Sequence, residues 1–475
     1  MNSWSNKSLV YITAAAPLVV GTCWLLSTYI HNKENYGDRR RKRKINWNKE
    51  TTGIKRLGLT CYLNTALQVL ASNDKFIEYL KNIDILVDNA FKKNRESNLK
   101  GFDFNFEFLQ IHFFLYDIIA RLQEGYESLY INISEIRHLE RILGTSLLEQ
   151  SDWLEILERI VDTLEKENHK IDTTTLLNKN NNGDKKLPEL PFYGTLSTRS
   201  YCSICKNTAR PNSKLMVENE RKNSILIDMT TQNEYKNDTF EQILTRSLCD
   251  IVQDYTCSYC SIKRKIDKKD NISNLTKEKF ENGNIYINDD DVIDMESLTR
   301  NDLIKANLVK INKFVKYPET LILSLNRFKC SYNGQFIRVN NIYCDFPKFL
   351  NFNGHNYRLN NLVKHSGGVR TGGHYQVYKK KPLLIKNKYK NKETDKLELI
   401  NYELKNRLVD IETGLNTNDL SELKLVSSKE YDPFNKNVND YWLVNDDKCK
   451  EVSLLYDINP YDSNNITSLI YEMIN

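Results

Sequence analysis

The stretch GIKRLGLTCYLNTALQVL, residues 53–70, decides the fold of this chain. Its first half contains two glycines and is typical of a turn, while Leu63 and Leu67 in its second half share one face of a helix. Thr60 is the predicted N-cap of that helix, which places Cys61 in the first turn. The helix dipole and the free amides there stabilise a thiolate, the nucleophilic form of cysteine. Cys61 is therefore a candidate nucleophile, although a lone cysteine is more often inert packing.

Two later stretches supply partners for such a nucleophile. In YRLNNLVKHSGGVRTGGHYQVYKK (357–380), two glycines precede His374 and an aromatic strand follows it. Glycines let another backbone approach closely, as a peptide in a narrow cleft requires. In YWLVNDDKCKEVSLLY (441–456), Asn445 and Asp446 interrupt an apolar segment. A cysteine, then a histidine, then an asparagine is the chain order of papain-like proteases.

Two Cys-x-x-Cys pairs form a separate signal. Cys202 and Cys205 make the first pair, and Cys257 and Cys260 make the second, with 51 residues between the pairs. Four thiolates are a tetrahedral ligand set for structural zinc. The separation exceeds that of an ordinary zinc ribbon, so we expect each pair to lie at the tip of its own hairpin. The alternative is a chain that has lost the metal.

The bulk composition is that of a folded protein. The chain has 475 residues, 40% of them hydrophobic, and 68 basic residues against 62 acidic ones give a net charge of +6. A length of this size allows one large domain or two to three ordinary ones. Without the basic run at 39–44 the chain is close to neutral, so a nucleic-acid surface is not indicated. Ten cysteines in a long chain of this kind favour a reducing compartment.

The N-terminus predicts a membrane anchor. Residues 9–30 contain no charged side chain, and as a helix they would extend about 33 Å, enough to cross a hydrocarbon core of about 30 Å. Lys7 alone precedes the segment, whereas the basic run 39–44 follows it, so the C-terminal bulk is expected in the cytosol. A cleaved signal peptide and a buried core helix are the alternatives for the segment, and a nuclear signal is the alternative for the basic run.

Composition also divides the remainder of the chain. Residues 53–165 contain segments of helical period, among them 108–122 and 153–164. Residues 262–305, rich in Lys, Asn and Asp, are expected to be a solvent-exposed insertion. From Tyr317 onward the pattern is typical of β-strands.

Together these motifs resemble the ubiquitin-specific proteases across nearly all of residues 53–475. The nucleophile motif of that family matches at Gly53, Gly58, Thr60, Cys61, Tyr62, Asn64, Leu67, Gln68 and Leu70. The histidine motif matches at Tyr357, Leu359, His365, Gly367, Gly373, His374, Tyr375 and Tyr378. The segment 150–164 resembles a further family motif, and an apolar span ahead of the nucleophile resembles the members anchored in the mitochondrial outer membrane.

The resemblance implies an α+β fold of papain-like type, preceded by one transmembrane helix. Its thumb, palm and zinc-ribbon fingers would form one catalytic domain. The implied parts are the anchor 9–30, the basic juxtamembrane linker 31–49 and the catalytic domain 50–475, with thumb about 53–165, fingers about 190–317 and palm about 318–475.

The resemblance also implies roles for single residues. Cys61 would attack the carbonyl of ubiquitin's C-terminal glycine, His374 would transfer the proton, and Asn445 would orient the imidazole. Asp152 and Glu155 fall at positions that meet the substrate in the family, although Asp152 is also read as an exposed acid at a helix start.

The remaining implications concern Asp446, the metal and the partners. Asp446 would share the orienting task of Asn445 or serve as a turn residue. The fingers would hold structural Zn²⁺ and grip ubiquitin. The expected partners are thus ubiquitin, ubiquitinated proteins and a membrane, with no nucleic acid.

Two positions depart from the family pattern. Arg56 stands where the family has an asparagine that donates to the oxyanion, and Leu59 stands where asparagine is usual. Loss of one oxyanion donor typically lowers turnover about 100- to 1000-fold, although the Arg56 guanidinium can itself donate. A deubiquitinating thiol protease is the predicted function. A catalytically weak, ubiquitin-binding adaptor at a membrane is the alternative, and a zinc-dependent interaction protein is a third class that explains only the Cys pairs.

Overall fold

The structure is a computed structural model that describes most of the chain from residue 51 onward. The described residues are 51–96, 108–123, 128–173, 187–230, 239–268, 270–296, 298–330, 333–334, 336–338, 346–367, 373–381, 441–453 and 464–474. The predicted anchor 9–30 and linker 31–49 lie outside these ranges. Within the described ranges, no helix has both the length and the apolar character that a bilayer span requires.

The chain divides into two compact units. The first comprises residues 1–190, 363–403 and 409–459, and the second comprises 191–362, 404–408 and 460–475. The described elements of the first unit are β1 (Gly53–Ile54), α2 (Cys61–Ser72), α3 (Asp74–Glu96), α4 (Gln110–Gln123), β2 (Ser128–Leu129), α5 (Ile133–Leu143), α6 (Trp153–Thr173), β13 (Gly373–Lys380), β14 (Tyr441–Asn445) and β15 (Lys448–Val452).

The helix α2 is the centre of the first unit. Every one of its 12 residues is buried, because α4 and α6 pack on it together with the strand β13. An amphipathic helix at the surface buries one face only, so burial on all sides explains the small and apolar residues of this helix. The strands β13, β14 and β15 pair antiparallel in that order. This pairing brings the start of β13 and the end of β14 close to the start of α2.

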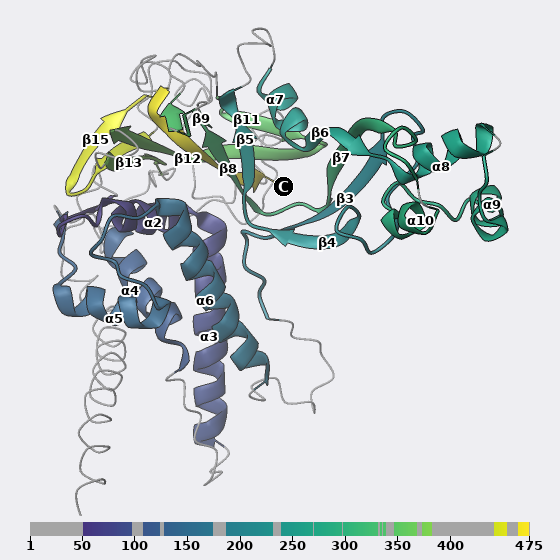
Figure 1. Cartoon of the computed structure of the whole chain (residues 1–475). Helices are drawn as coiled ribbons and strands as arrows, with labels where there is room; N and C mark the ends of the chain where they lie inside the picture. Colours follow the sequence, from purple (N-terminus) through teal and green to yellow (C-terminus); the bar gives the residue numbers. More distant parts are fainter. Residues whose placement is uncertain are drawn as a thin grey trace, which may run out of the picture. The chain divides into compact units, whose positions relative to one another are not determined.

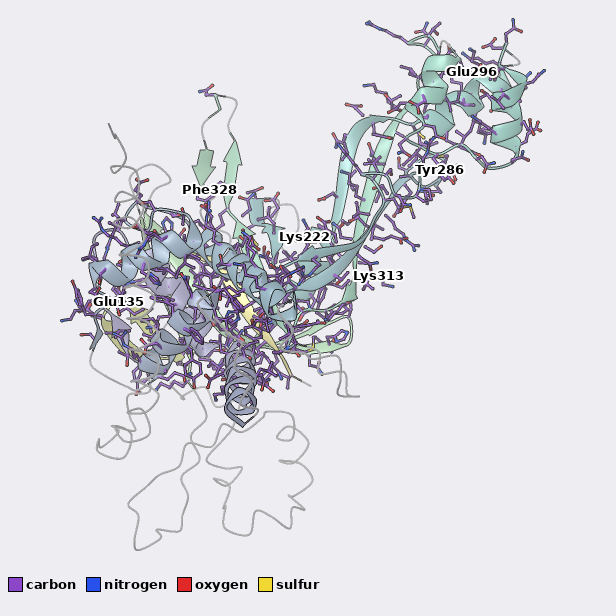
Figure 2. The ribbon with its side chains drawn as sticks, turned by 90° about the horizontal axis from the view of Figure 1, so that it is seen from below. Glu135, Lys222, Tyr286, Glu296, Lys313 and Phe328 are labelled. Atoms are coloured by element: carbon purple, nitrogen blue, oxygen red, sulfur yellow. The ribbon has the colours of Figure 1, made fainter. Side chains whose placement is uncertain are left out.

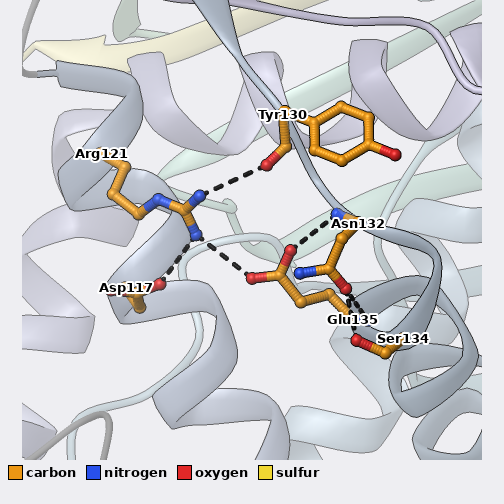
Figure 3. A network of polar contacts seen from close by, with 6 residues as sticks. All are labelled: Asp117, Arg121, Tyr130, Asn132, Ser134 and Glu135. Carbon is orange, nitrogen blue, oxygen red and sulfur yellow. Dashed lines mark hydrogen bonds and ion pairs between the residues drawn. The ribbon is translucent and has the colours of Figure 1, made fainter.

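A polar network closes the connection between α4 and α5 (Figure 3). Arg121 on α4 contacts Asp117 at 3.2 Å and Glu135 on α5 at 3.4 Å. The Asn132 side chain accepts from the Glu135 amide, and the Glu135 carboxylate accepts from the Asn132 amide, which is a complete capping box. The network fixes the segment after β2, and β2 pairs with β1 at the entrance of the nucleophile loop.

The second unit is mainly β-structure. Its described elements are β3 (Gly194–Cys202), β4 (Val217–Lys222), β5 (Ile225–Asp228), α7 (Phe240–Ser247), β6 (Cys249–Thr256), α8 (Ser258–Asp267), α9 (Asn274–Glu281), α10 (Asp290–Met295), β7 (Lys305–Lys316), β8 (Thr320–Asn326), β9 (Phe328–Cys330), β10 (Phe336–Arg338), β11 (Phe349–Phe352), β12 (His355–Gly367) and β16 (Ile466–Ile474). The strand β12 crosses the boundary between the units after Leu362.

Two sheets organise this unit. One has the strand order β4-β3-β7-β6. In the other, β16 lies between β12 and β8, β5 pairs parallel with β8, and β11 pairs with β12. The near-continuous apolar run of β8 fits a strand that has a neighbour on both sides. Helices in one part of the chain and mainly antiparallel strands in the other confirm the predicted α+β class.

The insertion expected at 262–305 folds into helices. At the end of the four-stranded sheet lie α8, α9 and α10, grouped as Figure 1 shows. Ile262, Ile285 and Val292 form a small core between them. Figure 2 places Tyr286 and Glu296 in this helical tip. Most described residues of this insertion are exposed or half-buried, and a few apolar residues, sparse among the Lys, Asn and Asp residues, suffice for a core this small.

Candidate active site

Cys61 is the first residue of α2, and its side chain is only 3% exposed. Thr60 holds the N-cap position, as predicted, but its side chain does not cap the helix. The Thr60 Oγ1 accepts instead from the Leu57 amide at 3.0 Å, which closes the turn before the helix. The Thr60 side chain therefore accepts no hydrogen bond from the first amides of α2. The dipole of these amides favours negative charge on the Cys61 sulfur.

His374 and Asn445 meet across neighbouring strands. His374 is the second residue of β13, directly after Gly373, and Asn445 is the last residue of β14. The His374 Nε2 lies 2.6 Å from the Asn445 Oδ1. An amide oxygen accepts only, so Nε2 carries the proton of the neutral ring and Nδ1 is left to face Cys61. The three residues that the sequence placed far apart are thus assembled in the first unit.

Asp446 is a turn residue that also lies near the imidazole. Its backbone φ is 50°, so it is a left-handed residue in the turn between β14 and β15. Its Oδ1 accepts from the Asn64 Nδ2 at 2.8 Å. Its Oδ2 lies 3.8 Å from the His374 Nε2. The Asp446 carboxylate therefore adds negative charge beside the imidazole while Asn64 holds it in place.

The electrostatics favour an ion pair between Cys61 and His374. Burial raises the pKa of the Cys61 thiol, but the hydrogen bond to His374 and a backbone hydrogen bond at Tyr375 outweigh it, so the pKa lies below its ordinary value. The hydrogen bond to Cys61 raises the pKa of His374, and burial opposes this rise. Asn445 and the charge of Asp446 add to the rise. A thiol with a lowered pKa beside an imidazole with a raised pKa is the combination that a cysteine nucleophile requires.

At two positions of the site a neighbouring residue approaches the backbone so closely that only glycine fits. A Cβ on Gly373 would lie 2.0 Å from the His365 Nε2, and one on Gly53 would lie 2.5 Å from the Asp447 carbonyl. The His365 ring packs 4.4 Å from the Tyr375 ring, centroid to centroid. His365 thus supports the strand that carries His374. The peptide approach inferred from the glycines is not the contact that Gly373 makes here.

Asp152 and Glu155 are engaged within the chain. The Asp152 Oδ1 accepts from the Leu154 amide at 2.7 Å, at the start of α6. Its Oδ2 accepts from the Tyr375 hydroxyl at 2.7 Å, next to the histidine. Glu155 pairs with Arg159 one turn on, at 3.0 Å. The structure places Asp152 near the site and Glu155 on an exposed helix face, and substrate binding by either residue stays a prediction.

Arg56 lies beside the histidine. Its Nη1 is 3.4 Å from the His374 Nδ1, and its Nε donates to the Gly58 carbonyl at 2.7 Å. Leu59, the other departure from the family pattern, is 42% exposed. The Leu59 carbonyl lies 4.0 Å from the Cys61 Sγ, so Leu59 contacts the nucleophile and Arg56 contacts the histidine.

Some residues at the site were not assigned a role from the sequence. Asn64 links α2 to the Asp446 turn, and the Lys379 Nζ donates to the Gln68 Oε1 at 3.3 Å, which links β13 to α2. Gln68 also donates to the Thr52 carbonyl at 2.7 Å. A signal existed: Asn64 and Gln68 are polar residues four apart on a helix otherwise filled with apolar and small ones.

The four cysteines of the two pairs converge in the second unit. Their sulfurs all lie within 4.8 Å of one another. The Cys202 and Cys260 sulfurs are 3.8 Å apart, and those of Cys205 and Cys257 are 3.9 Å apart. These distances exceed the S–S bond of about 2.05 Å. They match the edge of about 3.8 Å of a tetrahedron with Zn–S bonds of about 2.3 Å.

The surroundings also suit a metal ion. Ile287, which is fully buried, packs with the cysteines in one apolar cluster. The first pair begins at Cys202, the last residue of β3, and the bridge between Tyr201 and Thr208 closes its turn. The second pair does not lie on a hairpin as expected, because Cys257 caps α8 and accepts from the Cys260 amide. The residues present therefore fit a structural metal.

Comparison with known proteins agrees with this site. The described fold, with a buried thiol beside a half-buried imidazole, is that of a cysteine peptidase. Residues 52–454 match the family model described as ubiquitin carboxyl-terminal hydrolase. The chain therefore belongs to the ubiquitin carboxyl-terminal hydrolase family.

Two curated relatives and two solved structures illustrate the relationship. Ubiquitin carboxyl-terminal hydrolase 16 of Saccharomyces cerevisiae is 24% identical over 452 residues, which cover 84% of this chain and 85% of the relative. Ubiquitin carboxyl-terminal hydrolase 11 of Schizosaccharomyces pombe is 24% identical over 330 residues, 68% of this chain and 72% of the relative. A structure of the yeast SAGA DUBm overlaps with a TM-score of 0.48 at 14% identity, covering 94% of this chain and 74% of that chain. The SAGA Ubp8/Sgf11/Sus1/Sgf73 DUB module bound to ubiquitin aldehyde gives 0.47 at 15% identity, covering 94% and 75%.

Proposed function

We propose that this chain hydrolyses the bond after the C-terminal glycine of ubiquitin on protein conjugates, at a membrane surface. Family membership supports the reaction class. The observation that carries the proposal is the assembly of Cys61, His374 and Asn445, with the imidazole held at 2.6 Å by the asparagine. The matching family model and the two curated relatives, all described as ubiquitin carboxyl-terminal hydrolases, support ubiquitin as the ligand class.

The geometry supports a two-step acyl transfer. The Cys61 proton passes to the His374 Nδ1, and the sulfur attacks the glycine carbonyl, whose electron pair moves onto oxygen. When the carbonyl re-forms, the C–N bond breaks and the leaving lysine amine takes the proton from His374. A water then attacks the thioester carbonyl while His374 accepts its proton, the C–S bond breaks to release the ubiquitin carboxyl group, and the Cys61 sulfur recovers the proton from His374. Asn445 holds the ring in the required tautomer through both steps.

The pKa shifts define the pH window of this reaction. The active pair needs a thiolate and an imidazolium together, and the two groups titrate as a pair. The thiolate is lost as the pH falls through the lowered pKa of Cys61, and the imidazolium is lost as the pH rises through the raised pKa of His374. We expect a bell-shaped kcat/KM with its maximum between the two. A kcat/KM that still rises above about pH 9, where an unperturbed thiol ionises, would contradict the ion pair.

Cleavage of a fluorogenic ubiquitin conjugate by the purified full-length protein tests the function. We expect turnover by the native protein and inhibition by thiol reagents. The adaptor alternative predicts bound ubiquitin without measurable cleavage, and it draws support from Arg56 at the histidine. A protein that neither cleaves nor retains ubiquitin in a pull-down would exclude both functions.

We further propose that the four cysteines hold one structural Zn²⁺ in a fingers subdomain. The convergence of their four sulfurs within 4.8 Å and the buried cluster around Ile287 support this assignment. The ion would cross-link β3 to the start of α8 and so stabilise the helical tip. The division into thumb 53–165, fingers 190–317 and palm 318–475 belongs to the same proposal, as does substrate contact by Asp152 and Glu155.

The membrane surface is proposed from the sequence. The uncharged segment 9–30 and the basic residues that follow it support a single-pass anchor with the catalytic domain in the cytosol. The resemblance to anchored family members favours the mitochondrial outer membrane.

Protease accessibility tests this topology. Protease added to intact mitochondria should digest the catalytic domain, because it faces the cytosol. Deletion of residues 1–30 should release the protein into the soluble fraction. A control variant in which the basic residues of 39–44 are replaced by neutral ones keeps the anchor. It therefore tests separately whether these charges set the orientation. A catalytic domain that resists external protease until the membrane is dissolved would reverse the proposed orientation.

A further inference from the structure

Arg56 sits on an anchored loop. The Ile54 amide donates to the Asp446 carbonyl and the Lys55 amide to the Leu129 carbonyl, both at 2.8 Å. Leu129 belongs to β2, and the network of Figure 3 holds the segment that follows. The Arg56 Nε is then tied to the carbonyl of Gly58, a left-handed glycine with φ 62°. The base of the side chain is therefore fixed although the residue is exposed.

The free end of Arg56 meets the reactive nitrogen of the histidine. Its Nη1 lies 3.4 Å from the His374 Nδ1, which is a long hydrogen bond. The Nε2 is already bonded to Asn445 at 2.6 Å, so Nδ1 is the nitrogen that serves Cys61. The Arg56 guanidinium and the Cys61 thiol can therefore each donate to the same acceptor, the Nδ1 lone pair of the neutral imidazole.

Proton transfer changes this contact. Once Nδ1 takes the Cys61 proton it can only donate, so it no longer accepts from the guanidinium. The guanidinium stays charged at every working pH, and a cation beside an imidazolium is repelled. The anion at hand is the new thiolate, which a nearby cation stabilises. Burial raises the pKa of Cys61, and the charge of Arg56 is among the causes that lower it, after the contributions of His374 and Tyr375.

Other charged groups face the pair as well, among the described residues. Asp446 comes from the turn after β14, and its carboxylate opposes Arg56 across the imidazole. Tyr375 comes from β13, with its hydroxyl bonded to Asp152 at the start of α6. Of these groups, Arg56 alone carries positive charge. Its removal would therefore delete the one cation of this named set and leave the Asp446 and Asp152 carboxylates.

We propose that Arg56 is a catalytic residue of this chain: its guanidinium is the fixed cation that holds Cys61 in the thiolate form after the proton moves to His374. The proposal rests on the proposed function only in taking Cys61 as the nucleophile. Arg56 departs from the family pattern, and by this proposal the departure aids catalysis instead of impairing it. The Arg56 guanidinium stabilises the Cys61 thiolate by its charge, whereas a neutral side chain could stabilise an anion only by donating a hydrogen bond.

The test is the pH dependence of Cys61 alkylation by iodoacetamide, a neutral reagent, measured on the full-length protein by mass spectrometry of the Cys61 peptide. Arg56→Gln removes the charge and keeps a donor, and Arg56→Lys keeps the charge. Lys55→Gln is the matched control, since it removes the same charge one residue away. We expect Arg56→Gln to slow alkylation about threefold or more at pH 6, with little change at pH 9. Arg56→Lys should restore most of the rate, and Lys55→Gln should resemble the native protein.

Three results would overturn the proposal. Arg56→Gln could alkylate like the native protein at every pH, Lys55→Gln could slow alkylation as much as Arg56→Gln does, or a folded Arg56→Lys could lose reactivity like Arg56→Gln. Should Arg56→Gln fail to fold by circular dichroism, Arg56→Lys decides with a second measurement. Alkylation of the native protein at pH 6 should then slow as salt screens the exposed cation, with little change at pH 9. Alkylation needs no ubiquitin, so a native protein that shows these shifts without cleaving ubiquitin would refute the proposed function and leave this inference standing.

Discussion

Replacement of Cys61 by Ala should lower the turnover of a ubiquitin conjugate by at least about ten-thousandfold, to background. The sulfur forms the covalent bond of the reaction, and nothing else at the start of α2 can replace it. His374→Ala should have an effect of similar size, because it removes the base that takes the thiol proton. Steady-state kinetics with a fluorogenic ubiquitin conjugate measures both losses.

The control for this prediction is Cys449→Ala. Cys449 lies on β15 in the same unit, is half-buried, and is outside the reactive pair, so its loss should change turnover less than about twofold. Affinity for ubiquitin should survive Cys61→Ala, since the substitution deletes one buried atom. Residual turnover above a hundredth of the native rate in Cys61→Ala would show that another group is the nucleophile.

Replacement of Cys202 by Ser should remove the metal and destabilise the second unit by several kcal/mol. The cluster joins the end of β3 to the start of α8, and a zinc ion with three thiolates and a hydroxyl binds much more weakly than one with four thiolates. We expect one zinc per chain in the native protein and a small fraction of that in the variant. Elemental analysis gives the metal content, and thermal unfolding followed by circular dichroism gives the stability.

Cys249→Ser is the matched control for the metal. Cys249 is a half-buried thiol on β6, the strand that leads to the second pair, and it is not part of the cluster. Zinc content should be unchanged in this variant, and the melting temperature should change little. A native protein without zinc, or a Cys202→Ser variant with full zinc content, would show that these cysteines are not a metal site.

The sequence by itself determined the chemistry of the site. The helical period after Thr60 predicted α2, and the glycine-flanked strand predicted β13 with His374 at its start. These features depend on local periodicity and turn chemistry, which a sequence carries directly. The spacing of the two Cys pairs likewise predicted a four-cysteine cluster, which the structure contains, because a thiolate set is recognisable without knowledge of the fold.

Tertiary structure alone decided how the groups face one another. Arg56 and His374 are 318 residues apart, and their 3.4 Å contact depends on β1 being held between β2 and the Asp446 turn. The role of Asp446 depends on Asn64, 382 residues away, which fixes one carboxylate oxygen and leaves the other near the imidazole.

The helical tip beyond the cysteines was hidden for a related reason. Its core joins Ile262 to Ile285 and Val292, which come from separate short segments of a polar stretch. A local pattern shows which residues are apolar, but contacts between distant segments form only when the whole chain has folded.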